Sequence, residues 1–271
     1  MFSFIHEAKS IAYIIRKGEK NYELLVYAIQ GSKYRYLRLP GGGKNDDESS
    51  IEAMYREVEE EIGLDREDLV YLRKAGRLAY YKPGIAKQVS RTDYLLHVRD
   101  GVDPAGEKQV AGNDKDKGCV FSYKWIDNSR FEEIDPELSQ FLNPYNVPEL
   151  FMESFDYGLA KGCIELRNAH DQWKRLYEFE AIELYEATGG VHAINHIGST
   201  AVAELHAKPI IDILVGLKDG LSTDIFVHQL ESIGYASRGS FGIEGRLYFT
   251  KGTESKDRKS TRLNSSHRIR S

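Results

Sequence analysis

A glycine-rich turn that leads into a helix crowded with glutamates constrains this chain more than any other feature. The stretch reads LPGGGKNDDESSIEAMYREVEEEIGL over residues 39–64, and Glu57, Glu59, Glu60 and Glu61 lie within five residues. Residues three and four apart share a helix face, so all of these carboxylates except Glu59 face one small region. They repel one another unless a cation lies between them, and oxygen-rich clusters are what Mg²⁺ and Mn²⁺ prefer. The pattern therefore predicts a divalent-cation site.

The other face of the same helix is apolar, with residues that step by three or four: Ile51, Met54, Val58 and Ile62. We expect this face to pack on a sheet and to hold the carboxylates still. Gly63 is expected to end the helix. The glycines Gly41, Gly42 and Gly43 allow the backbone to approach a ligand or a metal closely. A solvated acidic helix is the alternative that the glutamates alone would favour.

The spacing of the charged residues argues against that alternative. Gly42 is followed after five residues by Glu48, and after seven more by a run from Arg56 to Leu64. This run resembles the Nudix box, G-x5-E-x7-R-E-U-x-E-E-x-G-U, at every specified position over 23 residues. The resemblance covers about residues 8–150. It implies a Nudix α/β/α sandwich that hydrolyses a nucleoside diphosphate linked to another moiety.

The Nudix resemblance also implies a role for each residue of the box. Three glutamates are expected to bind the catalytic Mg²⁺ or Mn²⁺: Glu57, Glu60 and Glu61. Glu57 is the candidate that helps to activate water, and the carbonyl of Gly41 is expected to complete the coordination. Arg56 and Glu48 are expected to orient the carboxylates through an ion pair. The metal would spread charge off the phosphoryl oxygens and generate the attacking hydroxide.

One carboxylate that many Nudix proteins add from a late loop or strand has no obvious counterpart. The chain reads CVFSYKW up to Trp125, without an acid. Asp114 and Asp116, in the loop before it, are substitutes whose spacing is more typical of solvated side chains, so the general base stays open. Four tyrosines are candidates either to stack on a substrate base or to pack within the sheet: Tyr34, Tyr36, Tyr80 and Tyr81.

Apolar and aromatic runs around the box predict strands, which cover residues 10–17, 22–30, 69–81, 91–100 and 119–127. Residues 101–118 are polar and rich in glycine, which predicts a loop. Residues 135–142, DPELSQFL, predict a short second helix, and the two prolines of NPYNVPEL end the block. Strands that flank one helix, with another helix near the end, indicate an α/β or α+β domain of about 150 residues.

A second block begins near residue 160 and alternates helices and strands. The pattern predicts helices over 167–190 and 222–235 and an apolar strand over 208–217. HIGSTAV, AKPIIDILVGL and GRLYFTKG resemble the GrpB-like family, a branch of the nucleotidyltransferase superfamily, over about residues 163–252. The resemblance implies a nucleotidyltransferase-like α/β domain.

The GrpB resemblance carries a tentative nucleotide site. Gly198 and Ser199 lie in a strand-to-helix turn, where backbone N–H groups and a hydroxyl can hold a phosphate. Asp212 would be a metal ligand, but its expected partner two residues on is Leu214, on the same strand face. Lys208 is either a phosphate contact or a surface charge. His196 is a weaker candidate, since a hydrogen-bonded histidine at a strand end explains it as well.

Composition limits the classes of function. The chain has 271 residues, 41% of them hydrophobic, and a formal net charge of −5, which argues against a general nucleic-acid surface. No signal peptide or membrane-spanning run is visible. Cys119 and Cys163 lie far apart, which indicates a reduced cytoplasmic protein rather than a disulfide-bonded one. We therefore expect a nucleotide-type small molecule as substrate and no membrane partner, while the oligomeric state stays open.

The basic tail DRKSTRLNSSHRIRS differs from the rest of the chain. Its first part, residues 257–267, looks like the translation of a sequencing adapter, which would cut the second domain off near Lys256. A flexible natural tail is the alternative. The expected organisation is a Nudix domain at 1–150, a linker at 151–162, an incomplete GrpB-like domain at 163–256, and a disordered or artefactual tail at 257–271.

The expected activity is therefore Mg²⁺-dependent hydrolysis by the first domain, with the second as an accessory. Two alternatives stay open. The Nudix fold could be idle and sense nucleotides for a partner, or the second domain could carry the main activity as a nucleotidyltransferase. The intact box favours hydrolysis, and Leu214 counts against nucleotidyl transfer.

Overall fold

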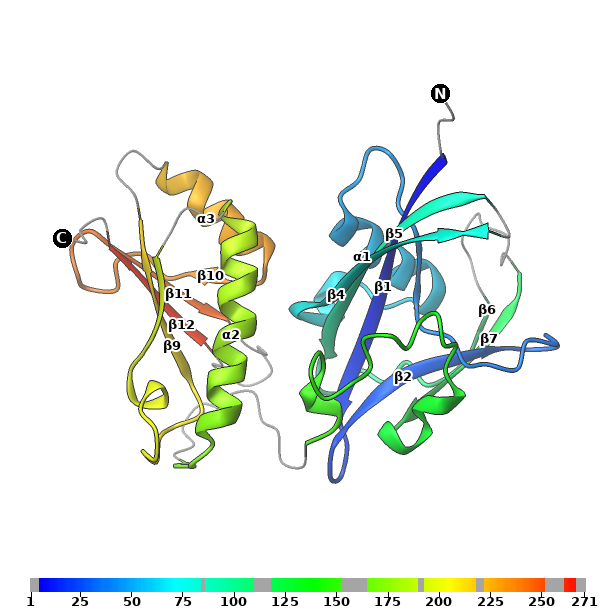
Figure 1. Ribbon diagram of the computed structural model, residues 1–271, viewed down its shortest axis with the longest axis horizontal. Coiled ribbons are helices and arrows are strands. Elements are labelled where there is room, and N and C mark those ends of the chain that lie inside the picture. The colour runs from blue at the N-terminus through cyan, green and yellow to red at the C-terminus, as the bar shows by residue number, and fades with distance from the viewer. Residues whose placement is uncertain are drawn as a thin grey trace. The chain divides into compact units, whose positions relative to one another are not determined.

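The chain folds around two β-sheets, one in each of two units, Met1–Phe155 and Asp156–Ser271 (Figure 1). The computed structural model describes residues 5–83, 86–109, 118–152, 165–189, 193–217, 222–251 and 261–266. Within these ranges no helix is both long enough and apolar enough to cross a bilayer. The expected linker at 151–162 lies almost entirely outside the described residues.

The first unit is built on a mixed sheet with the strand order β4-β5-β1-β2-β7-β6, and the short β3 pairs with β1. The strands are β1 (Ile5–Lys17), β2 (Tyr22–Ile29), β3 (Gly41–Gly43), β4 (Leu69–Lys82), β5 (Lys87–Val98), β6 (Gly106–Gln109) and β7 (Val120–Ile126). β1 and β5 run parallel, and the other pairs are antiparallel. The continuous apolar run 11–15 of β1 is buried throughout, as expected for a strand covered on both faces.

Helix α1 (Ser50–Ile62) carries the glutamates and packs against β1 and β3. It begins with a capping box, in which the Ser49 hydroxyl accepts the Glu52 N–H at 3.3 Å and Glu52 accepts the Ser49 N–H at 2.7 Å. Gly63 ends it in the left-handed conformation, with φ of 80°. Met54 and Val58 are fully buried. The predicted helix, its glycine stop and its apolar face are therefore present.

The predicted helix at 135–142 is wrong, because this segment forms separate turns. The N–H groups of Leu138 and Ser139 both bond to the Asp135 carbonyl, but the ladder does not continue. Side chains from the sheet donate hydrogen bonds to carbonyl groups of this segment instead. Arg91 donates to the Glu137 carbonyl, and the Tyr13 hydroxyl donates to the Leu138 carbonyl at 2.9 Å. Within the described part of the first unit, α1 is thus the only α-helix, and a second helical layer is absent there.

Short 3-10 turns complete the first unit: Arg66–Asp68, Asn128–Glu133 and Pro148–Leu150. The last of these is tied to β4 by a buried ion pair. Arg73 donates to Glu149 at 2.9 Å, and their side chains are 3% and 0% exposed. Strand β6 lies within residues 101–118, where the sequence predicted only a loop. The backbone of β6 forms hydrogen bonds with the edge of β7, and this pairing does not require apolar side chains in β6.

The second unit has a five-stranded sheet with the order β10-β11-β12-β9-β8. Its strands are β8 (Ala193–Ile197), β9 (Ile211–Gly216), β10 (Ala236–Ser237), β11 (Arg246–Lys251) and β12 (Thr261–Ser266). Helix α2 (His170–Ala187) packs on β8 and β9 and contacts α3 (Thr223–Ser232), and its face is anchored by the buried Trp173 and Leu184 (Figure 1). Both helices therefore lie within the predicted ranges.

The expectation that residues 257–271 pack on nothing does not hold for β12. Its backbone pairs with β11 on one side and runs parallel to β9 on the other. The segment TRLNSS has a low apolar content, so a hydropathy pattern does not predict a strand there. The strand can still form, because its ladder hydrogen bonds come from the backbone. Residues 252–260 and 267–271 lie outside the described residues.

Removal of residues 257–271 tests the contribution of β12. Without it, β9 and β11 each lose a ladder partner. Their amides should therefore exchange hydrogen faster in a variant that lacks only residues 257–271 than in the full chain. Amides of β1 and β5, in the first unit, are the internal control and should not change. Unaltered protection in β9 and β11 would show that the segment is a dispensable tail.

The buried pair between Arg73 and Glu149 predicts where the first unit can be cut. A fragment of residues 1–152 keeps this pair and should unfold cooperatively on heating. A fragment of residues 1–147 leaves Arg73 buried without its carboxylate, which costs roughly 3–5 kcal/mol, so its melting temperature should fall markedly. Equal melting temperatures for the two fragments, measured by circular dichroism, would contradict this role for the pair.

Candidate active site

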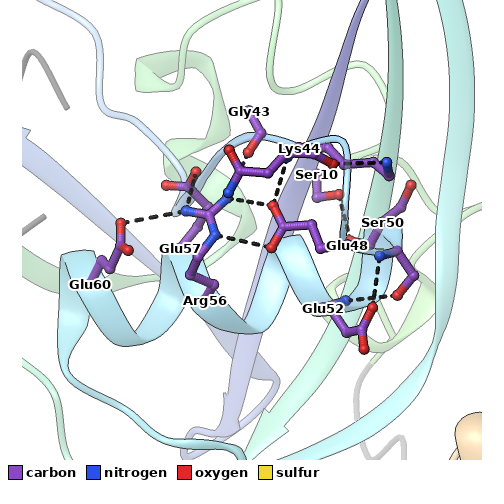
Figure 2. A network of polar contacts seen from close by, with 11 residues as sticks. Ser10, Gly43, Lys44, Glu48, Ser50, Glu52, Arg56, Glu57 and Glu60 are labelled. Carbon is purple, nitrogen blue, oxygen red and sulfur yellow. Dashed lines mark hydrogen bonds and ion pairs between the residues drawn. The ribbon is translucent and has the colours of Figure 1, made fainter. Parts of the chain in front are cut away.

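Arg56 is the centre of the polar network on α1 (Figure 2). Its guanidinium donates to both oxygens of Glu48, at 3.1 and 2.8 Å, and to the Gly43 carbonyl at 2.8 Å. On its other side it donates to Glu57 at 3.0 Å and approaches Glu60 at 3.4 Å. One cation thus joins the glycine turn, the loop before the helix and two carboxylates of the helix. The predicted ion pair between Arg56 and Glu48 is present.

These contacts fix the charge states of the pair. The hydrogen bond to Glu48 raises the pKa of Arg56, and the same bond lowers the pKa of the Glu48 carboxyl. A two-pronged contact between guanidinium and carboxylate restricts orientation as well as charge. The pair is therefore suited to hold neighbouring carboxylates in position.

The remaining glutamates divide by burial. Glu57 and Glu61 are 4% and 7% exposed, whereas the side chain of Glu60 is 35% exposed. Glu61 accepts the Gly41 N–H at 2.9 Å and lies 3.3 Å from the Tyr27 hydroxyl. Burial raises the pKa of Glu61 to about 8, with a further contribution from the charge of Glu57. The cluster thus keeps a carboxyl group where its ionised form is costly.

The glycines of the turn are required by close packing. A Cβ on Gly42 would lie 2.4 Å from the Glu57 carboxyl carbon. A Cβ on Gly41, which has φ of 135°, would lie 2.2 Å from the Ser10 carbonyl oxygen. Any larger residue would displace either the carboxylate or strand β1. The turn therefore lets the backbone lie against the Glu57 carboxylate, whereas the predicted approach to a ligand or a metal stays a prediction.

The donor chemistry of this cluster fits a hard divalent cation. Among the described residues, no three His, Cys, Asp or Glu side chains form a ready-made metal cluster. Even so, Glu57 and Glu61 are buried oxygen donors one turn apart on the helix, and burial raises the pKa of Glu61. A cation there would offset the burial cost, and oxygen is the ligand it prefers.

A cavity of about 190 Å³ adjoins the turn, because Gly41 and Gly42 form part of its wall. Its charged lining consists of Lys9, Arg38, Lys82, Arg91, Asp135 and Glu137. Tyr34 also lines it, whereas the other three candidate tyrosines do not. Sequence reasoning missed Arg38, although its position directly before LPGG was a usable signal. It also missed Tyr27, whose contact with Glu61 joins residues far apart in the chain.

No acid on β7 completes the cluster. Asp114 and Asp116 lie outside the described residues. At the corresponding place the structure has Tyr123, whose hydroxyl is buried without a hydrogen-bond partner among the described residues. Burial and the nearby charge of Glu61 raise the pKa of Tyr123. The phenol therefore stays neutral beside the carboxylates.

In the second unit the predicted residues only partly converge. Asp212 lies against the turn, since a Cβ on Gly198 would come within 2.8 Å of its Oδ2. Ser199 begins the short 3-10 helix Ser199–Ala201 directly after that turn. Leu214 shares the half-buried face of β9 with Asp212, so the second carboxylate is absent there. Lys208 is exposed.

His196 has a structural environment. Its ring stacks on Tyr177 with centroids 4.8 Å apart, and its Nε2 lies 3.1 Å from the Thr200 hydroxyl. Burial lowers the pKa of His196. These contacts favour the hydrogen-bonded strand-end histidine over a phosphate ligand. Of the two cysteines, Cys119 is free, and Cys163 lies outside the described residues.

Comparison with known proteins matches each unit separately. Residues 7–143 match the NUDIX domain, and residues 163–267 match the GrpB protein family, a range that includes β12. UPF0157 protein YqkA of Bacillus subtilis is 27% identical over 177 residues, 65% of this chain and 48% of the relative. Glutamate-rich protein GrpB of Alkalihalophilus pseudofirmus is 36% identical over 99 residues, 36% of this chain and 57% of the relative. The chain thus spans about half the length of these relatives.

Two solved structures are similar to parts of the chain. GrpB from Enterococcus faecalis is 32% identical, with 38% of this chain and 61% of that chain covered and a TM-score of 0.35. A binary complex of the C. elegans Ap4A hydrolase is 19% identical, with 50% and 92% covered and a TM-score of 0.40. The chain belongs to the NUDIX family through its N-terminal domain at residues 7–143, and it carries a C-terminal GrpB domain at residues 163–267.

Proposed function

We propose that the first unit catalyses divalent-cation-dependent hydrolysis of a diphosphate that links a nucleoside to another moiety. The observation that carries this proposal is the Arg56 network, which ties Glu48 to Glu57 and Glu60 while the buried Glu61 lies on the same helix. A solvated acidic helix would need neither a buried carboxyl pair nor a cation that orders it. The NUDIX match over residues 7–143 supports the same reaction class.

The residues divide into ligands and positioning groups. Three glutamates and one carbonyl are assigned to hold Mg²⁺ or Mn²⁺: Glu57, Glu60, Glu61 and the carbonyl of Gly41. When bound, such a cation withdraws charge from phosphoryl oxygens and lowers the pKa of a water ligand. Glu57, held by Arg56 at 3.0 Å, is assigned to accept the proton of the attacking water. Arg56 and Glu48 are assigned to hold the carboxylates in their orientation without contacting the reacting atoms.

For the second unit we propose nucleotide binding without nucleotidyl transfer. The site is the turn at Gly198 and Ser199, with Asp212 against it, and the exposed Lys208 is assigned as a phosphate contact. Two-metal transfer needs paired carboxylates to clamp the phosphate, and Leu214 stands where the second would be. The nucleotidyltransferase-like fold would thus serve as an accessory to hydrolysis. Transfer of a labelled nucleotidyl group by the full chain, abolished by Asp212→Asn, would contradict this assignment.

Loss of one carboxylate should abolish hydrolysis while the fold persists. The full chain is screened with Mg²⁺ against nucleoside di- and triphosphates, nucleotide sugars and dinucleotides, and the best substrate is kept. Glu60→Gln and Glu61→Gln should each lower kcat by about 100-fold or more, because each removes charge from the cation site. Glu59→Gln is the matched control, since Glu59 lies on the same helix but is exposed. Wild-type turnover by either cluster variant would remove the cluster from the active site.

The raised pKa of Glu61 predicts how stability depends on pH without metal. Its ordinary value is 4.5 and its value in the fold is about 8, so the protonated form is favoured by folding. The stability that protonation provides is complete below pH 4.5 and is lost as the pH rises through 8. Glu61→Gln, melted in EDTA, should therefore gain melting temperature over the wild type at pH 8.5 and little at pH 5. A difference that is equal at both pH values would show that Glu61 titrates normally.

A further inference from the structure

Arg38 differs from every other charged side chain that lines the cavity beside Gly41 and Gly42. Its Nε is buried and has no hydrogen-bond partner, and no ion pair to its guanidinium forms among the described residues. Its guanidinium carbon lies 5.8 Å from the centre of the Tyr34 ring. A buried guanidinium nitrogen without an acceptor is costly, which makes this half-buried side chain a candidate for binding an anion from outside.

The other charges of the cavity are already paired. Lys82 contacts Glu137 at 2.7 Å, and Lys9 contacts Glu7 at 3.2 Å. Arg91 lies 2.7 Å from its own partner, Asp93. Asp135 accepts the hydroxyl of Tyr34. The acids that could neutralise Arg38 from within the cavity are therefore engaged elsewhere.

The backbone of Arg38 is held next to residues that contact the carboxylate cluster of α1. Its backbone forms both hydrogen bonds of an antiparallel bridge with Tyr27, at 3.0 and 2.8 Å. The same Tyr27 contacts Glu61, and Gly41, three residues after Arg38, donates to that carboxylate. The charge of Arg38 also acts to lower the pKa of Glu61, which agrees with their proximity. An anion on Arg38 would therefore lie at the edge of the carboxylate cluster.

We propose that Arg38 binds a phosphate of the substrate's diphosphate group and so places the scissile bond beside the carboxylates of α1. The proposal rests on the proposed hydrolase function. The planar fork of an arginine matches two phosphate oxygens, which a single ammonium does not. At about 190 Å³ the cavity is smaller than the 300–1,000 Å³ or so typical of pockets that enclose a whole ligand, so it suits the compact anionic part of the substrate.

Binding of methylenediphosphonate, a diphosphate analogue whose P–C–P bridge cannot be hydrolysed, tests the proposal directly. The full chain is titrated calorimetrically with this probe in Mg²⁺ buffer. Arg38→Gln should weaken binding by about tenfold or more, and Arg38→Lys, which keeps the charge but not the fork, should weaken it less. Arg35→Gln is the matched control, because Arg35 lies three residues earlier, is exposed and does not line the cavity. It should bind within about twofold of wild type.

Turnover measured on the same proteins separates the two proposals. Arg38→Gln should raise KM for the best substrate by a similar factor, with a melting temperature close to that of wild type. If the wild type binds the probe through Arg38 but hydrolyses nothing, the hydrolase function fails and the phosphate site stands. If hydrolysis is robust while Arg38→Gln matches wild type in probe affinity and KM, the role of Arg38 is refuted. Failure of the wild type to bind the probe would also refute it.

Discussion

The contact between Arg56 and the glutamates around it is the interaction on which the candidate site depends. Without a cation, the carboxylates of α1 would repel one another across a single turn of helix. Arg56 contacts Glu48, Glu57 and Glu60 at once and also holds the Gly43 carbonyl. It thereby links the loop, the helix and the glycine turn into one unit. Glu61 lies outside the reach of this arginine, and its carboxyl is the one that burial leaves poorly compensated.

The packing of α1 on the sheet holds this network in place. Met54 and Val58 anchor α1 on the sheet, and the Ser10 hydroxyl donates to the Ser50 carbonyl at 2.6 Å to join β1 to the first turn. Gly42 allows the Glu57 carboxylate to lie against the backbone. Because interiors are close-packed, a small shift of the helix would move carboxylates and cavity wall together. The geometry of the site is thus a property of the helix–sheet contact.

The box could be predicted because its residues follow local sequence patterns. Elements that depend on contacts between distant residues could not be predicted. Helix α1 follows from its apolar spacing and its glycine stop, and Arg56 meets Glu48 because a fixed spacing in the sequence encodes that pair. The helix expected at 135–142 failed because Arg91 and Tyr13, distant in sequence, take its carbonyl groups. Strand β12 could not be foreseen, since pairing with β9 and β11 uses backbone groups that every residue carries.

The candidate site shows the same division. Glu57, Glu60 and Glu61 could be named from periodicity, but their unequal burial depends on how β1 and β3 cover the helix. The partners Tyr27 and Arg38 come from segments that the sequence does not connect to the box. Their roles follow from the structure, in which the backbone bridge between Tyr27 and Arg38 lies beside Glu61.

The claim that α1 and the glycine turn form a divalent-cation site is tested most directly by substoichiometric Mn²⁺ added to the isotope-labelled full chain. The paramagnetic ion broadens the amide signals nearest to it in two-dimensional NMR spectra. The account predicts that amides of residues 41–43 and 56–61 broaden first, and that excess Mg²⁺ restores them. Broadening spread over exposed acids elsewhere, such as Glu67 and Glu132, with residues 41–43 unaffected, would contradict the account.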